Sequence, residues 1–218
     1  GTMILCALIG LFVVSLSFSL PNEKKKQFSA KEALHFLDLR KKKKLFKIFL
    51  ILFFMLGLSW GFVGGFVKPL FLDNLGFAAG TIGLILGVQT LLAGVFSYLF
   101  SKSSHMRRLI LLSGILYSAT FFLLGFLDSV FAGALLIAYG FVEGMTSIGQ
   151  EGILSRITDK NSYGTDIGLL MMGLHVGETL SLALSGLLIS IWGFVAPFLL
   201  TALTYTIFSV ASYVILNE

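Results

Sequence analysis

Apolar residues gather in seven long runs, each of which is long enough to cross a lipid bilayer as a helix. About 20 predominantly apolar residues are needed, because a helix rises ~1.5 Å per residue through a ~30 Å hydrocarbon core. The predicted spans are Met3–Leu20, Ile48–Val67, Ala79–Phe100, Leu109–Leu127, Val130–Ile148, Ile167–Ile191 and Phe194–Leu216. Lipid leaves no partner for free backbone groups, and the short alternating strands of a barrel are missing. The pattern therefore predicts an all-α, polytopic membrane helix bundle.

The positive charges sort to one side of the membrane once these spans are marked. All but one of the 16 Lys and Arg residues fall in the loops after the first, third and fifth spans. The exception is Lys68. Because positively charged loops resist translocation, the Lys- and Arg-rich loops are predicted to be cytoplasmic, and residues 68–78 to form an external loop. The C-terminus is then cytoplasmic as well.

The composition excludes a soluble domain. The chain is 56% hydrophobic and only 12% charged, whereas soluble domains carry about 25% charged residues. The net charge of +5 resides in short juxtamembrane loops, so anionic lipid headgroups are the expected partners and nucleic acid is not. Cys6 is the only cysteine, so no intramolecular disulfide is possible. An integral membrane protein is predicted, with the plasma membrane as its location.

The chain divides into three parts: one span at 1–20, a basic linker at 21–47, and six spans at 48–218. In the linker, Ser29 and Glu32 have the spacing of a capping box, which is typical of the start of a helix. A short amphipathic helix on the membrane surface and a solvated basic linker are the two alternatives. The first span would enter the membrane from outside, and the chain begins at Gly1. We therefore expect further sequence upstream. Glycine pairs at four-residue spacing indicate closely packed helices; they are Gly61/Gly65, Gly83/Gly87, Gly140/Gly144 and Gly173/Gly177.

Two stretches carry a resemblance to a known family. The segments Phe71–Phe77 and Ile82–Gly87 resemble the second and third helices of a C-terminal half in the major facilitator superfamily. The segment Ile153–Phe198 resembles the same family through its polar turn, its spaced glycines and its Trp-Gly-Phe sequence. The resemblance implies that residues 1–20 match the family's sixth helix and that five helices precede them. It also implies alternating access between two six-helix halves, with a small-molecule substrate.

The family's cytoplasmic motif is degenerate in this chain. The motif usually reads Gly-x-x-x-Asp-Arg-x-Gly-Arg-Arg, and its nearest match is Gly94–Arg108. Ser101 and Lys102 stand where Asp and Arg are usual, and only Arg107 and Arg108 are kept. This departure bears on the subfamily more than on the family.

A second cytoplasmic turn also departs from the family pattern. Tyr163–Gly164 replaces the usual Arg-Gly, while Glu151 and Arg156 keep an acidic residue followed by a basic one. Together with Arg107 and Arg108, these residues are candidates for a cytoplasmic gate, with plain surface charge as the alternative.

Three ionisable residues fall inside predicted spans: Glu143, His175 and Glu178. A charge at a helix centre costs at least ~2.5–3.5 kcal/mol on insertion scales, so such residues face a bundle interior or water and usually have a function. Counted from the predicted span ends, they lie roughly 9, 13 and 18 Å from the cytoplasmic face. We expect them to couple transport to protons, with interhelical hydrogen bonding as the alternative role.

Polar and aromatic residues on the same spans are candidates for a substrate cavity: Trp60, Gln89, Tyr139 and Gln150. Packing is the alternative for Trp60, and a position near the headgroups is the alternative for Gln150. The sequence contains no metal cluster, phosphate loop or nucleophile–base pair, so no enzymatic activity and no cofactor are expected.

The favoured interpretation is a proton-coupled secondary transporter of a small organic solute. Export is slightly favoured over uptake, because the expected cavity is apolar and aromatic. A seven-helix receptor is the alternative from another class, although Phe194–Leu216 lacks the lysine of a retinal protein. A non-transporting scaffold related to the family is a third interpretation.

Overall fold

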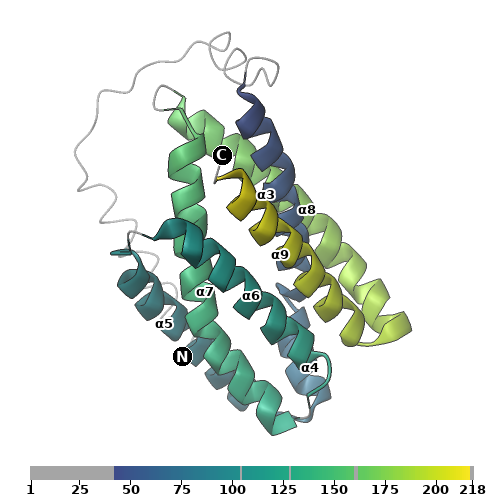
Figure 1. Ribbon diagram of the computed structural model, residues 1–218. Helices are drawn as coiled ribbons and strands as arrows, with labels where there is room; N and C mark the ends of the chain where they lie inside the picture. Colours follow the sequence, from purple (N-terminus) through teal and green to yellow (C-terminus); the bar gives the residue numbers. More distant parts are fainter. Residues whose placement is uncertain (1–41, 104, 128, 160–161, 217–218) are drawn as a thin grey trace, which may run out of the picture. The chain divides into compact units, whose positions relative to one another are not determined.

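The computed structural model describes residues 42–216 except residues 104, 128 and 160–161. Every regular element in this part of the chain is a helix (Figure 1). The helices are α3 (Lys44–Val63), α4 (Val67–Asn74), α5 (Ala79–Phe100), α6 (Met106–Leu124), α7 (Ser129–Ile157), α8 (Tyr163–Trp192) and α9 (Val195–Ile215). The predicted first span and the capping box at Ser29 lie outside the described residues.

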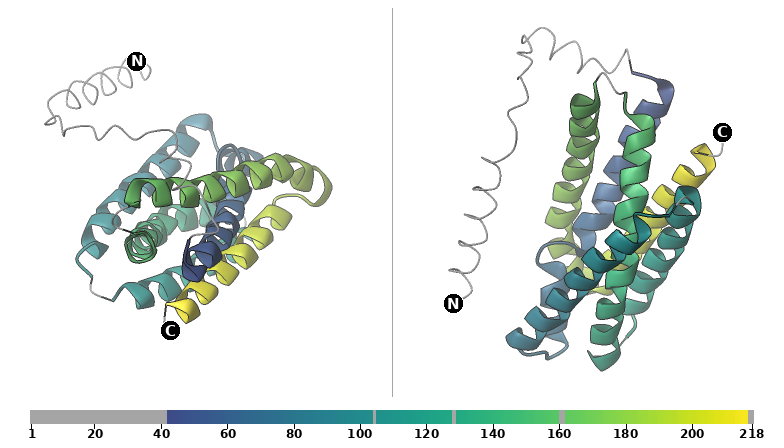
Figure 2. Two further views of the ribbon diagram at one scale, coloured as in Figure 1. Left: turned by 90° about the horizontal axis from the view of Figure 1, so that it is seen from above. Right: turned by 90° about the vertical axis from the view of Figure 1, so that its left-hand side faces the viewer.

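Six helical segments are long and apolar enough to span a membrane, which confirms the predicted fold class for the described part of the chain. Helix α5 has the same bounds as its predicted span, Ala79–Phe100. The helices pack as neighbours in the order α8, α3, α9, α6, α7 and α5, and α8 also contacts α9 (Figure 2). Helices α3, α6 and α7, from distant parts of the sequence, thereby come to surround a common interior.

The predicted loop at 68–78 is helical over residues 68–74. Helix α4 occupies Val67–Asn74 and continues the direction of the span after a turn at Gly64–Phe66, where Gly65 has φ +52°. Pro69 is tolerated because it lies in the first turn, where its missing N–H is not needed. Phe71 anchors the helix: its ring lies 5.3 Å from that of Phe194 and 4.9 Å from that of Phe198.

Two helices run further than their predicted spans. Helix α7 continues past Ile148 to Ile157, and α8 begins at Tyr163 rather than at Ile167. The polar residues that ended the predicted α7 span do not end the helix, because Ile153 and Leu154 behind them are buried in the core. Glu143 therefore lies at the middle of its helix, about 21 Å from either end.

Some of the glycine pairs do hold helices together. A Cβ added at Gly61 would lie 2.1 Å from the carbonyl oxygen of Glu178, and one added at Gly140 would lie 2.3 Å from that of Gln89. Gly177 makes an equally close contact with α3, at 2.2 Å, and Gly144 a looser one with α5, at 2.8 Å. The pair Gly83/Gly87 is different, because both glycines have open space within 4 Å among the described residues.

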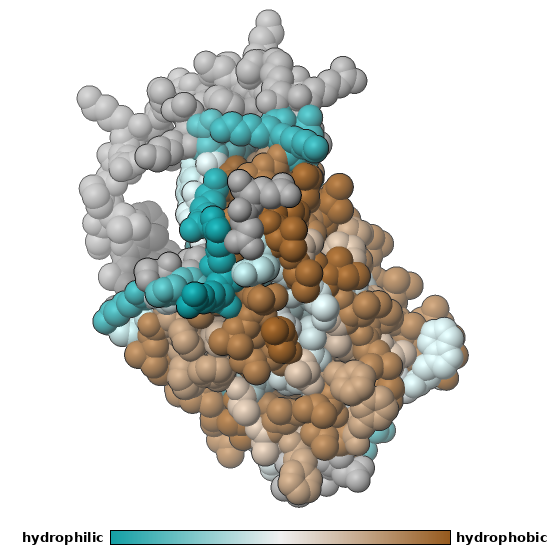
Figure 3. Space-filling view, in the orientation of Figure 1, coloured by the Kyte–Doolittle hydropathy of each residue, from teal (hydrophilic) through white to brown (hydrophobic). Residues whose placement is uncertain are grey.

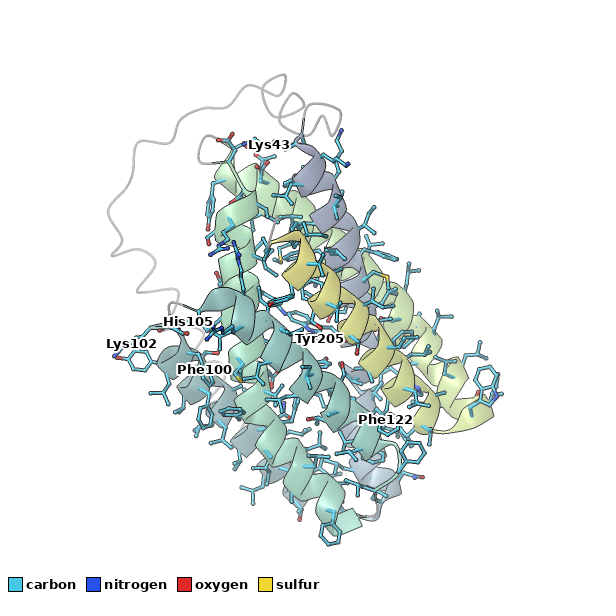
Figure 4. The ribbon with its side chains drawn as sticks, viewed as in Figure 1. Lys43, Phe100, Lys102, His105, Phe122 and Tyr205 are labelled. Atoms are coloured by element: carbon cyan, nitrogen blue, oxygen red, sulfur yellow. The ribbon has the colours of Figure 1, made fainter. Side chains whose placement is uncertain are left out.

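The surface separates by polarity. Apolar side chains cover the flanks of the helices, and hydrophilic side chains gather along the upper left edge in Figure 3. Lys43, Lys102 and His105 lie along this edge, whereas Phe122 lies toward the opposite end of α6 (Figure 4). The start of α3 and the α5–α6 connection thus lie on the side that the charge pattern predicted to be cytoplasmic.

Candidate functional site

A cavity of about 190 Å³ lies among five helices, α3, α4, α6, α7 and α8. Its lining combines aromatic, hydroxyl and charged side chains, and two glutamates and one lysine contribute to it. The lining residues are Trp60, Val63, Gly64, Lys68, Tyr117, Tyr139, Glu143, Thr146, Ser147 and Glu178. Four predicted cavity or coupling residues therefore meet at one place: Trp60, Tyr139, Glu143 and Glu178.

Glu143 is half-buried on α7 and is held by α5. Its Oε2 accepts a hydrogen bond of 2.6 Å from Nε2 of Gln89, whose side chain is almost fully buried. The other amide atom, Oε1 of Gln89, is buried without a hydrogen-bond partner among the described residues. An unpaired buried acceptor is costly. The amide of Gln89 thus has spare capacity directly beside the carboxyl group of Glu143.

Lys68 was not predicted as a site residue, and it carries the cation of the cavity. It lies on α4 with its Nζ 5.3 Å from the centre of the Tyr139 ring, and it attracts Glu143 electrostatically. The two residues do not form an ion pair within 4 Å. No described residue accepts a hydrogen bond from Lys68. A signal for it existed in the sequence, because Lys68 is the one basic residue that breaks the sorting of charges.

Glu178 and His175 form a pair on α8. Nδ1 of His175 lies 2.9 Å from Oε2 of Glu178, and the two side chains are 66% and 37% exposed. Only Glu178 lines the cavity. Counted from Tyr163, Glu178 lies about 22 Å along α8, which matches the depth of Glu143 along α7. The two carboxyl groups therefore line the same cavity from two different helices, α7 and α8.

Aromatic rings form the inner wall. The Tyr117 ring stacks on that of Tyr205, with centroids 3.8 Å apart and planes 12° apart, and meets Tyr139 edge-on at 5.5 Å. Trp60 is partly buried on α3 and faces the same cavity. Gln150, the remaining predicted cavity residue, is buried beside Tyr205 and outside the cavity lining. The aromatic rings of Tyr117, Tyr139 and Trp60 thus line the same cavity as Lys68.

The acidic and basic residues predicted to form a cytoplasmic gate do not form an ion pair with each other in the structure. Glu151 and Arg156 are both exposed and form no ion pair together. They are five residues apart on one helix, and residues must be three or four apart to meet on a helix surface. Arg107 and Arg108 are likewise exposed, in the first turn of α6.

A different ion pair closes this end of the bundle. Nζ of Lys42, before α3, pairs with Oδ1 of Asp166, in the first turn of α8. Oδ2 of Asp166 accepts hydrogen bonds from the Asp159 backbone N–H and the Ser162 hydroxyl, each at 3.0 Å. The Asp166 side chain is 2% exposed. The sequence could not pair Lys42 with Asp166, because the two are far apart along the chain.

The comparison with known protein families gives one match. The model of the Major Facilitator Superfamily matches residues 49–218, which is most of the chain. The chain belongs to this superfamily. The resemblance seen in its sequence is thereby confirmed, and the protein is a membrane transporter by family rather than a receptor. Neither the curated proteins nor the solved structures contain a significant match to it.

Proposed function

We propose that this protein is a proton-coupled secondary transporter of a small organic solute, working by alternating access. The observation that carries the proposal is the position of Glu143, which is half-buried deep in a spanning helix, on the cavity wall, between Gln89 and Lys68. An ionisable carboxyl group in the middle of a membrane-spanning helix is costly, so residues of this kind usually have a function. Loading and releasing a proton at the substrate cavity is the function that suits a transporter.

Gln89 can act as the hydrogen-bond partner of Glu143 in both its ionised and its protonated form. Its Nε2 already donates to the carboxylate, and its unpaired Oε1 is the natural acceptor for the hydroxyl that protonation creates. The amide of Gln89 can therefore remain hydrogen-bonded to the Glu143 carboxyl group whether that group is charged or neutral. We propose the pair of Glu178 and His175 as a second proton-binding group on the opposite wall, with Trp60 and Tyr139 as contacts for the solute.

Alternating access requires a second half, and two helices provide surfaces for it. Only 17% of the most apolar stretch of α5 and 28% of that of α8 are buried, against 44–50% for the other described spans. We propose that an N-terminal half of the same protein covers these helices and that residues 1–20 belong to it. The 218-residue chain alone should then fail to transport, and co-expression with that half should restore transport. Uptake by the purified single chain in liposomes would contradict this.

The orientation is part of the proposal. We place the start of α3, residues 101–108 and residues 155–165 in the cytoplasm and the protein in the plasma membrane, because these connections carry the positive charge. The export direction expected from an apolar cavity loses its basis, however. Lys68, Glu143 and Glu178 give the cavity a charged lining.

Replacement of Glu143 by Gln tests the coupling. Glutamine keeps the shape and loses the titration, so a pH gradient should no longer drive accumulation, while exchange of solute for solute should survive. The assay uses the full-length protein in liposomes loaded with a pH dye, screened against small organic solutes. Asp73→Asn, at an exposed carboxylate outside the cavity lining, is the matched control. A normal gradient response in Glu143→Gln would reduce Glu143 to an interhelical contact.

A further inference from the structure

The charged groups of the cavity are unequally satisfied. Glu143 accepts a hydrogen bond from Gln89, and Glu178 lies 2.9 Å from a ring nitrogen of His175. Lys68 meets only the face of an aromatic ring, and among the described residues nothing accepts a hydrogen bond from its ammonium group. Both anions of the cavity therefore have polar partners, and its one cation does not.

We propose that Lys68 binds an anionic group of the transported solute, such as a carboxylate. This inference rests on the proposed function and names the class of its substrate. An ammonium group at a water-poor site gains most from a charged acceptor, because charge-assisted hydrogen bonds are about twice as strong as neutral ones. Tyr139 beneath the ammonium group and Trp60 beside it offer flat apolar surfaces for the rest of the solute. The volume of about 190 Å³ suits a small organic solute.

Binding of an anion at Lys68 links the solute to a proton. In the empty site Lys68 attracts Glu143. An anion at Lys68 takes over that role, and its negative charge favours the neutral form of Glu143. One proton delivered by hydronium from the solvent then forms an O–H bond on the carboxylate of Glu143, with Oε1 of Gln89 as the acceptor of that O–H, and a neutral water molecule is left. The added charges of the anion and the proton cancel. Three other titratable groups line the cavity, Tyr117, Tyr139 and Glu178, and His175 pairs with Glu178 outside the lining.

Because the bound proton neutralises the charge of the bound anion, the two are expected to be transported together. The anion and the proton bind together and cross together, so an inward proton gradient drives uptake of the anion. A cationic solute would instead compete with the proton for the glutamates, and the two would then move in opposite directions. The charge of the bound solute is thus the quantity to measure.

Three probes of the same size and different charge decide it: benzoate, benzamide and benzylammonium. The reporter is the fluorescence of Trp60 in the full-length protein in nanodiscs. All variants carry Trp192→Phe, and the signal of a protein that also carries Trp60→Phe is subtracted, so that the difference reports on Trp60. Benzoate should change the signal saturably and bind more tightly than the other two. Lys68→Gln should weaken benzoate roughly tenfold or more, the loss of one charge-assisted hydrogen bond, and Lys68→Arg should restore binding.

Lys102→Gln is the matched control. Lys102 also lies over a ring, with its Nζ 5.1 Å from the centre of Tyr98, but it is exposed and outside the cavity. Its replacement should leave benzoate binding unchanged, and gel filtration should give one symmetric peak for every variant. The inference is overturned if benzoate does not bind, if it binds Lys68→Gln as tightly as wild type, or if benzylammonium binds best.

The coupling step has its own test. As the pH falls within the range in which benzoate stays ionised, the affinity of the wild type for benzoate should rise, and that of Glu143→Gln should stay constant. A constant affinity in the wild type would overturn the coupling step. Binding needs no gradient, so Lys68-dependent binding without transport would refute the proposed function alone. Gradient-driven transport that survives Lys68→Gln would refute this inference alone.

Discussion

Gly57→Ala tests whether contact between helix backbones sets the geometry of the bundle. A Cβ at this position would lie 1.9 Å from the carbonyl oxygen of Leu174 and 3.0 Å from the backbone nitrogen of Glu178. Ordinary contact begins near 3.4 Å, so α3 and α8 would have to separate by about 1.5 Å at this point. Backbone atoms cannot rotate away as a side chain can. Overpacking of this kind costs about 3 kcal/mol, and alanine's better helix propensity offsets about 1 kcal/mol of it.

We therefore expect Gly57→Ala to lower the free energy of unfolding by about 2 kcal/mol. The measurement is thermal unfolding of the 218-residue chain in detergent, followed by circular dichroism. Gly87→Ala is the control, since no described atom lies within 4 Å of the added Cβ, and it should melt at or slightly above the wild-type temperature. Equal melting temperatures for the two variants would mean that the close approach of α3 and α8 is not what holds the bundle.

Three further predictions concern other parts of the fold. Asp166→Asn should lower the stability by about 3 kcal/mol, because it leaves Lys42 without its partner, and a double-mutant cycle with Lys42→Gln should show a coupling well above experimental error. Phe71→Ala should cost about 3 kcal/mol in thermal unfolding by removing a buried ring, while Leu70→Ala, at an exposed neighbour, should cost little. Cysteines at Lys42 and Asn74 in a cysteine-free background should react with an impermeant reagent from opposite faces; labelling from one face would disprove the topology.

Hydropathy predicted the spans well and their ends less well. The cores of the spans follow from the cost of burying polar groups in lipid, and α5 shows that this term alone can define a helix. Helix ends depend on packing as well. Ile153 and Ile157 are buried beyond the polar residues that ended the predicted α7 span, so the helix continues there. Window-based reasoning treats a polar residue as a boundary and cannot recognise such packing.

The same limit explains which site residues were found. Glu143 and Glu178 stood out because each interrupts an apolar run, and they line the same cavity in the structure. Lys68 stands next to Pro69, at what looked like the end of a span, so it was assigned to a loop. Asp166 was overlooked because its importance comes from Lys42, a partner that only the fold brings near. A sequence shows where a single charged residue would be costly to bury, but it does not show which two distant residues form an ion pair.

Glycine contacts link the packing of the helices to the site. Gly61 approaches the backbone carbonyl of Glu178, and Gly140 approaches that of Gln89. Both contacts are closer than any side chain would allow, so they fix the distance and the register of two helix pairs at the residues that carry the polar groups. The 2.6 Å hydrogen bond between Gln89 and Glu143 depends on this approach. Glycine pairs that looked like packing alone therefore also position the site, and a side chain at Gly140 should disturb the hydrogen bond between Gln89 and Glu143 as well as the stability.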